Sequence, residues 1–212
     1  MSTFIHRFGI VRAASLALLL ASGHAVAAGG YETIDPPQNT ADPDKVEVLE
    51  FFWLGCPHCY SLEPSIEDWA EDIPENVVLR REAPPLNRSW ENHSRGFYAA
   101  QLLGKEEEFV AAMFEAIHEN RKPMRDPDSI ADLAAELGMD REKFLATMQS
   151  FAVQTKMNRA NQLARGAGLT GVPTIVINGK YRTGAALAGG NAGIIDVIDE
   201  TVAMEKREMG LE

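Results

Sequence analysis

The stretch that decides the fold spans residues 46–70 and reads VEVLEFFWLGCPHCYSLEPSIEDWA. Among its first eight residues, both the odd-numbered and the even-numbered positions are apolar except for two acids. Since these positions face opposite sides of a strand, the pattern is typical of a strand covered on both faces. Gly55 interrupts this run, and apolar residues then recur at helical spacing to about residue 70. The only cysteines of the chain, Cys56 and Cys59, therefore lie where a strand meets a helix.

Residues 1–27 have the three zones of a secretory signal peptide: a basic start, an apolar run over residues 13–21 and small residues that end at Ala27. A retained membrane anchor is the alternative, but the apolar run has only about half of the roughly 20 residues that a spanning helix requires. We expect cleavage near Ala27 and export of a soluble chain to the periplasm. In an oxidising compartment, a pair of thiols can persist as a disulfide.

The segments on either side of the motif are punctuated by Gly and Pro. Residues 28–45 predict a short leader with one edge strand near Tyr31. Residues 77–81 predict a second strand. From residue 88 to residue 166 the apolar spacing is helical, which predicts an all-helical block of about three to five helices.

After this block the sequence again has a pattern typical of β-strands. Residues 172–177 predict a strand, and Asn178-Gly179 predicts a hairpin. A glycine-rich connection then leads to a last helix, whose tail over residues 205–212 we expect to fray. The order of these elements predicts an α/β chain, with residues 46–87 and 167–212 on either side of an all-helical block over residues 88–166.

The Cys-Pro-His-Cys turn has the features of a reactive thiol site. Pro57 suits the first helical position, which places Cys56 at the helix N-cap. Free N–H groups, the helix dipole and His58 would favour the thiolate there, the dipole contributing about one pKa unit. A stabilised thiolate stabilises the dithiol over the disulfide, so the pair would donate its disulfide. Cys59, one turn into the helix, suits the resolving role.

Other interpretations of the cysteine pair are weaker. A structural disulfide would close too small a loop to stabilise the fold much. A structural zinc site needs four ligands, and no second Cys pair or His pair is present. Haem attachment needs His directly after Cys59, where Tyr60 stands. We predict no cofactor beyond the redox-active disulfide itself and no metal.

The motif, together with the later Gly171-Val172-Pro173-Thr174, resembles the DsbA family of thiol:disulfide oxidoreductases. This resemblance implies a thioredoxin-like fold interrupted by a helical domain. It also implies a cis Val172-Pro173 bond beside the cysteines, with Val172 binding the main chain of an extended substrate. Glu50 would be a buried acid that exchanges a proton with Cys59.

The residues alone leave alternatives to these roles. Proline at a strand start is usually trans, and an acid such as Glu50 more often lies at an exposed strand end. Many family members carry lysine near the buried acid where this chain offers Arg80 or Arg81, and arginine holds its proton, which weakens the proton-exchange role. Two histidines, His93 and His118, match no motif and are interpreted as ordinary helix or loop residues.

The predicted function is a periplasmic oxidase that donates the Cys56-Cys59 disulfide to unfolded exported polypeptides through a mixed disulfide on Cys56. The resemblance adds a DsbB-like membrane quinone reductase for reoxidation. The alternatives are a disulfide isomerase or reductase, and a non-catalytic peptide-binding holdase. A formal charge of -11 argues against nucleic acid as a partner, and we expect a monomer because the leader is too short for a dimerisation domain.

Overall fold

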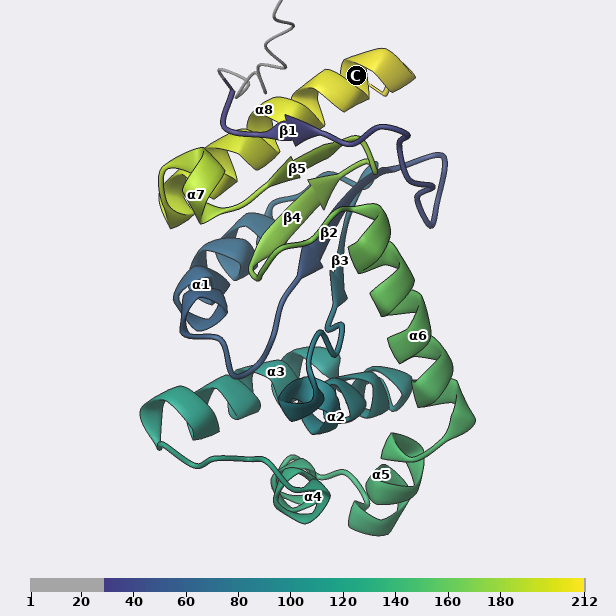
Figure 1. Cartoon of the computed structure of the whole chain (residues 1–212), viewed down its shortest axis with the longest axis vertical. Coiled ribbons are helices and arrows are strands. Elements are labelled where there is room, and N and C mark those ends of the chain that lie inside the picture. The colour runs from purple at the N-terminus through teal and green to yellow at the C-terminus, as the bar shows by residue number, and fades with distance from the viewer. Residues whose placement is uncertain (1–28, 212) are drawn as a thin grey trace, which may run out of the picture.

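The computed structural model describes residues 29–211 and has one mixed sheet with helices on both faces (Figure 1). The sheet order within these residues is β1-β5-β4-β2-β3. Its strands are β1 (Glu32–Thr33), β2 (Val46–Phe51), β3 (Val77–Glu82), β4 (Thr174–Ile177) and β5 (Tyr181–Thr183). The edge strand expected near Tyr31 is β1, which pairs with β5.

Strand β2 is an interior strand that leads directly to the cysteines. It pairs parallel with β3 and antiparallel with β4. All six of its residues are buried, as expected for a strand covered on both faces. The strand ends at Phe51, two residues before the end of the apolar run, and Trp53 lies beyond its ladder.

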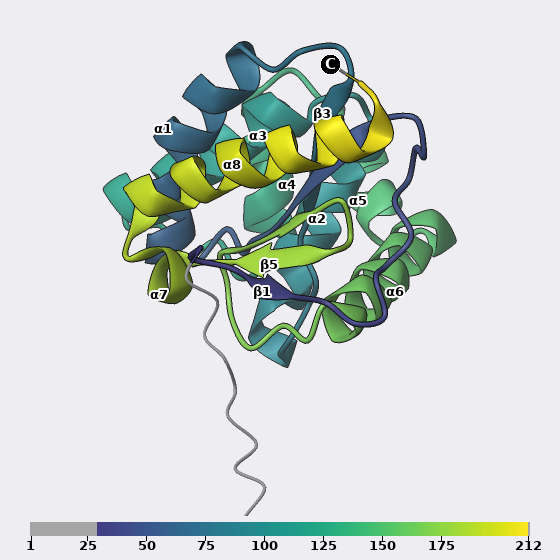
Figure 2. The same ribbon diagram turned by 90° about the horizontal axis from the view of Figure 1, so that it is seen from above.

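Helices cover both faces of this sheet (Figures 1 and 2). On one face lie α1 (Pro57–Glu71) and α8 (Asn191–Met209), which share a core with Val48 and Ile175. On the other face lies α6 (Phe151–Gly166), which packs on Leu49 and Val176. The short helix α7 (Ala185–Ala188) occupies the glycine-rich connection before α8.

Between β3 and α6 the chain is helical, as its spacing predicted. The elements are a 3-10 turn (Arg88–Trp90), α2 (Glu91–Leu102), α3 (Glu106–Phe114), a π turn (Glu115–Glu119), α4 (Pro127–Glu136) and α5 (Arg141–Met148). Asp126, Asp140 and Ser150 cap α4, α5 and α6 through their side chains.

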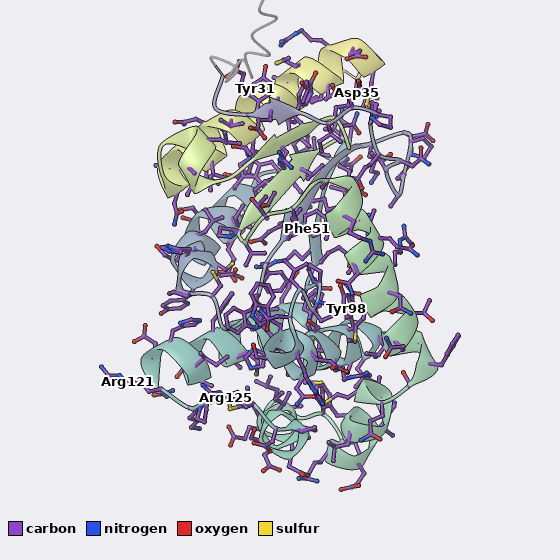
Figure 3. All side chains as sticks on the ribbon, viewed as in Figure 1. Tyr31, Asp35, Phe51, Tyr98, Arg121 and Arg125 are labelled. Atoms are coloured by element: carbon purple, nitrogen blue, oxygen red, sulfur yellow. The ribbon has the colours of Figure 1, made fainter. Side chains whose placement is uncertain are left out.

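The hydrophobic cluster of these helices extends to Phe52, just after β2, and to the cysteine motif. Phe52 stacks edge-on against Phe97 of α2, with ring centroids 5.1 Å apart. In Figure 3, Phe51 and Tyr98 lie inside the molecule, whereas Arg121 and Arg125 lie at its periphery. The tip of β2 and the cysteine motif are therefore held by both parts of the chain.

The expectation that residues 205–212 fray is wrong. Helix α8 continues to Met209, and Glu205 is fully buried. The β4-β5 hairpin supplies its partners: Lys180 forms an ion pair with Glu205 at 2.8 Å, and Asn178 donates to it at 2.5 Å. The predicted hairpin turn at Asn178-Gly179 is confirmed, with φ of 48° and 67°. A tail that is polar in sequence is thus anchored by a turn that is distant in sequence.

The predicted signal peptide and its cleavage site near Ala27 lie outside the described residues. Across residues 29–211, no helix combines the length and the apolar character needed to cross a membrane.

Candidate active site

Cys56 is the N-cap of α1, and Pro57 occupies the first helical position, as the motif predicted. The backbone N–H of Cys59 donates to Cys56 Sγ at 3.4 Å. Both cysteines are free thiols in this structure. Cys56 keeps 7% of its surface exposed and Cys59 none, so a substrate can reach only the first sulfur.

The environment separates the acidities of the two thiols. The pKa of Cys56 falls from 9.0 to about 6, chiefly because the Cys59 thiol hydrogen-bonds to its sulfur, against the opposing effect of burial. The backbone N–H groups of Cys59 and His58 and the charge of His58 add to this fall. Burial raises the pKa of Cys59, and the neighbouring Cys56 and Glu50 raise it further. Only Cys56 is therefore a thiolate near neutral pH.

The predicted substrate-binding residues lie beside the reactive sulfur. The Val172-Pro173 peptide bond is cis, as the family resemblance implied. As a thiol, Cys56 donates to the carbonyl oxygen of Val172 at 3.5 Å. An open cavity of about 490 Å³ runs from His58 past Val172 and Pro173 to residues 182–187. The antiparallel pairing of β4 with β2 brings this loop to the motif.

Glu50 is fully buried in β2, so the alternative of an exposed strand end is wrong. Its partner is Arg81, whose Nε donates to Glu50 Oε2 at 2.8 Å. Arg81 also donates to both oxygens of Glu63 on α1. Arg80, the other candidate, pairs instead with Glu47 at 2.6 Å and Glu82 at 2.8 Å.

Because Glu63 takes two donors of Arg81, Glu50 receives only one. Its Oε1 has no hydrogen-bond partner within residues 29–211. Burial, the largest effect, raises the pKa of Glu50 even though Arg81 opposes the rise. The effect of burial on the pKa of Glu50 therefore outweighs that of the charge of Arg81. No sequence pattern marks Glu63, since its contact with Arg81 depends on the packing of α1 against β3.

Two contacts hold the loop that precedes Cys56, and pattern analysis missed both. Trp53 stacks on Trp90, with ring centroids 4.5 Å apart and planes at 6°. His118 in the π turn donates through Nε2 to the carbonyl oxygen of Leu54 at 2.9 Å, and its ring stacks on Tyr60. The interpretation of His118 as an ordinary residue is therefore incomplete. Its partners lie about sixty positions away, and no local motif marks them.

His93 also faces this loop. Its ring lies 5.9 Å from that of Trp53, and it is hydrogen-bonded to the carbonyl oxygen of Met124 at 2.8 Å. Burial lowers its pKa, which favours the neutral imidazole. Its contacts are those of a packed core histidine.

Comparison with known proteins agrees with this geometry. The family model described as a DSBA-like thioredoxin domain matches residues 66–192. The thiol:disulfide interchange protein DsbA of Pseudomonas aeruginosa is 39% identical over 176 residues, 83% of each chain. The protein of the same name from Burkholderia cepacia is 39% identical over 201 residues, 94% of this chain and 93% of the relative.

Solved structures show the same fold. The crystal structure of Pseudomonas aeruginosa DsbA aligns with a TM-score of 0.81 at 38% identity and covers 85% of this chain and 94% of its own. The oxidoreductase DsbA of Xylella fastidiosa aligns with a TM-score of 0.78 at 28% identity, with 84% and 95% covered. The predicted α/β thioredoxin-like fold is confirmed. The chain therefore belongs to the DsbA family of thiol:disulfide interchange proteins and is a disulfide oxidoreductase.

Proposed function

We propose that this oxidoreductase donates the Cys56-Cys59 disulfide to reduced, unfolded polypeptides exported to the periplasm. The observation that carries the proposal is the lowered pKa of Cys56 at the start of α1. A thiolate exists only in the dithiol form, so its stabilisation favours reduction of the enzyme and oxidation of the substrate.

The reaction takes place in two exchanges. A substrate thiolate attacks the sulfur of Cys56, the Cys56-Cys59 bond breaks, and Cys59 leaves and takes up a proton. The second thiolate of the substrate then attacks the first substrate sulfur, which is bonded to Cys56 in the mixed disulfide, and releases Cys56 as a thiolate. Two electrons pass from the substrate to the enzyme, and the substrate gains one disulfide.

Glu50 is the proton donor for Cys59 in this scheme. Cys59 is a poor leaving group unless it is protonated, because burial raises its pKa. Glu50 is buried with a raised pKa and an unpartnered Oε1, so it can hold a proton within the core. Arg81 and Glu63 keep its carboxylate oriented. The reverse transfer would occur during reoxidation.

Substrate recognition would depend on the main chain. The backbone of Val172 is available to an extended peptide beside Cys56, and the adjoining cavity reaches residues 182–187. We propose that a DsbB-like membrane protein reoxidises the pair and passes the electrons to quinone. The enzyme would work as a monomer.

The proposal also covers the localisation of the protein and the division of its chain into segments. Residues 1–27 would act as a signal peptide cleaved near Ala27, residues 28–45 as a leader, and residues 88–166 as a helical domain inserted in the thioredoxin-like domain. Expression of the full chain in a bacterium, followed by osmotic shock and N-terminal sequencing, tests the export. A mature protein that stays in the spheroplast fraction would overturn the localisation.

A redox titration in glutathione buffers tests the direction of transfer. We expect a reduction potential well above that of thioredoxin, which is about -270 mV. A potential as low as that would make the protein a reductase and overturn the donor assignment. In parallel, Cys56→Ser is expected to abolish oxidation of a reduced two-cysteine peptide. Cys59→Ser, first converted by oxidised glutathione to its Cys56–glutathione disulfide, is expected to exchange glutathione for a one-cysteine peptide and to accumulate that mixed disulfide.

A further inference from the structure

Strand β3 is the open edge of the sheet on the side of β2. The amide of Val46 at the start of β2 and the amide of Phe52, just beyond its end, donate to the carbonyls of Asn76 and Glu82. The even-numbered residues of β3 therefore turn their backbone groups toward β2, since these groups alternate along a strand. The N–H and C=O groups of Leu79 and Arg81 point the other way, away from the sheet.

A cleft of about 910 Å³ runs along this edge. One wall is the second half of α1, from Ile66 to Glu71, together with Ile73 beyond its end. The other wall is formed by Gln101, Glu106 and Lys156 from the helical segment. Leu79 packs against the same hydrophobic cluster as Ile66 of α1 but is only partly buried. Exposed apolar surface and free backbone groups therefore lie side by side at this position of β3. An extended segment can add to such an edge as a further strand.

The two arginines of the cleft already have acidic partners. Arg80 pairs with Glu47 and Glu82, and Arg81 is held by Glu50 and Glu63. Lys156 donates to the neutral side chain of Gln101 at 2.8 Å and keeps its charge.

Three acids of the cleft have no such partner in the part of the chain that the structure describes. Within residues 29–211, Glu67, Glu71 and Glu107 form neither an ion pair nor a hydrogen bond through their side chains, and all three are exposed. Burial, the largest effect, and the nearby Glu63 raise the pKa of Glu67, although Arg81 opposes the rise. Because these three acids outnumber Lys156, the one free cation of the cleft among the described residues, the free charge of the cleft is negative.

We propose that this cleft is a second docking site, which takes an extended, cysteine-free segment of the substrate polypeptide carrying Lys or Arg. The inference rests on the proposed function for the nature of its ligand. A second copy of this chain fits poorly, because it would bring the same free acids against each other. The segment would add to β3 through Leu79 and Arg81, with its basic side chains toward the acids.

The position of the cleft links docking to catalysis. Ten residues of α1 lie between Cys56 and Glu67, so the rise over the eleven steps is about 16 Å at 1.5 Å per residue. An extended chain covers about 3.3 Å per residue, so roughly five or more residues between a cysteine and a basic segment can reach both sites. A substrate held at the cleft would present its thiol at a raised effective concentration.

The test uses a soluble cysteine-free peptide of alternating Lys and Val, with a Glu and Val peptide for comparison, added to the reduced full-length mature protein. Amide hydrogen exchange is followed by NMR. We expect the amides of Leu79 and Arg81 to become protected only with the Lys peptide. The amides of Val78 and Arg80 face β2 and serve as controls within the same strand.

Charge reversal supplies an independent measurement. We expect Glu67→Lys combined with Glu71→Lys to weaken binding of the Lys peptide about fivefold or more by calorimetry. Glu136→Lys combined with Glu200→Lys changes the net charge equally at exposed acids on α4 and α8 and should leave the affinity unchanged.

The proposal is overturned if the Lys peptide does not bind, if Leu79 and Arg81 stay unprotected, or if both double variants lose the same affinity. Because the peptide has no cysteine, a failed thiol exchange would leave this result intact. A failure of docking would equally leave the redox titration intact.

Discussion

At the scale of single residues, Cys56 and Cys59 show how three positions of sequence separation produce opposite chemistry. Cys56 receives hydrogen bonds at the helix start, whereas Cys59 lies one turn further in the core without exposed surface. Spacing and the position of Pro57 were enough to predict this division. The sharing of Arg81 between Glu50 and Glu63 was not predictable, because it depends on side chains from three elements.

The pH dependence of stability of the reduced protein follows from Cys56. Its folded pKa of about 6 lies below its ordinary value of 9.0, so the unfolded chain binds the extra proton between these values. The free energy of unfolding should therefore rise with pH above 6 and lose this contribution as pH falls through 6. Between pH 5 and pH 8 we expect a gain of about 2 to 3 kcal/mol from this group.

Urea unfolding of the reduced protein measures this gain, and Cys56→Ser is the matched control. The difference between the two proteins isolates the thiol from the other titrating groups. Thiolate absorbance at 240 nm gives the pKa directly. A difference that does not change between pH 5 and pH 8 would contradict the prediction.

Loss of Arg81 should strongly destabilise the fold. Arg81→Met would leave Glu50 and Glu63 in the interior without their shared partner, at a cost of about 3 to 5 kcal/mol. Arg80→Met is the control, because the side chain of Arg80 is more exposed, at 25% against 11%. Urea unfolding at pH 7 compares the two variants, and equal losses would show that the buried triad carries no special weight.

At the scale of elements, the active-site loop between β2 and α1 is clamped by the helical segment. The strand, the helix start and the β4-β5 hairpin have local signals in apolar spacing, Pro57 and Asn178-Gly179, and all three were predictable. The π turn over residues 115–119 has no such signal: its sequence continues the helical pattern of α3. Its contacts with Leu54 and Tyr60 appear only when the two segments pack together.

This clamp predicts the behaviour of two His118 variants. His118→Leu would leave the buried carbonyl of Leu54 without its donor, which costs about 1 to 3 kcal/mol. It should also raise the pKa of Cys56, because a looser loop no longer fixes the N-cap. His118→Gln can still donate and should recover most of both effects. Identical thiolate titrations for wild type and His118→Leu would rule out a positioning role.

At the scale of the whole molecule, one hydrophobic cluster joins the active-site turn to the helical segment. The cluster that contains Phe52, Leu54 and both cysteines also contains Phe97 and Phe114. Composition and spacing predicted the two segments of this fold, but not that the active site would lie in their shared core. The anchored C-terminal helix was missed for the same reason, since its partners Asn178 and Lys180 belong to the hairpin.

A shared core predicts that the molecule unfolds as one cooperative unit. The far-ultraviolet signal of the helices and the fluorescence of Trp53 and Trp90 at their junction should give coincident urea transitions. Phe97→Ala should move both transitions together, with a loss of about 3 to 5 kcal/mol. Two separated transitions would show that residues 88–166 unfold independently.

The complete burial of Cys59 affects how long a substrate stays joined to Cys56. Once a substrate is joined to Cys56, Cys59 stays protonated and is a slow nucleophile. Cys59 therefore seldom attacks the sulfur of Cys56 to re-form the enzyme disulfide and release the reduced substrate. The joined state then waits for a second thiol from the substrate. A protein with two nearby cysteines leaves quickly, whereas a protein with one cysteine stays attached. Because Cys59 is buried, the lifetime of the mixed disulfide thus depends on how many thiols the substrate carries.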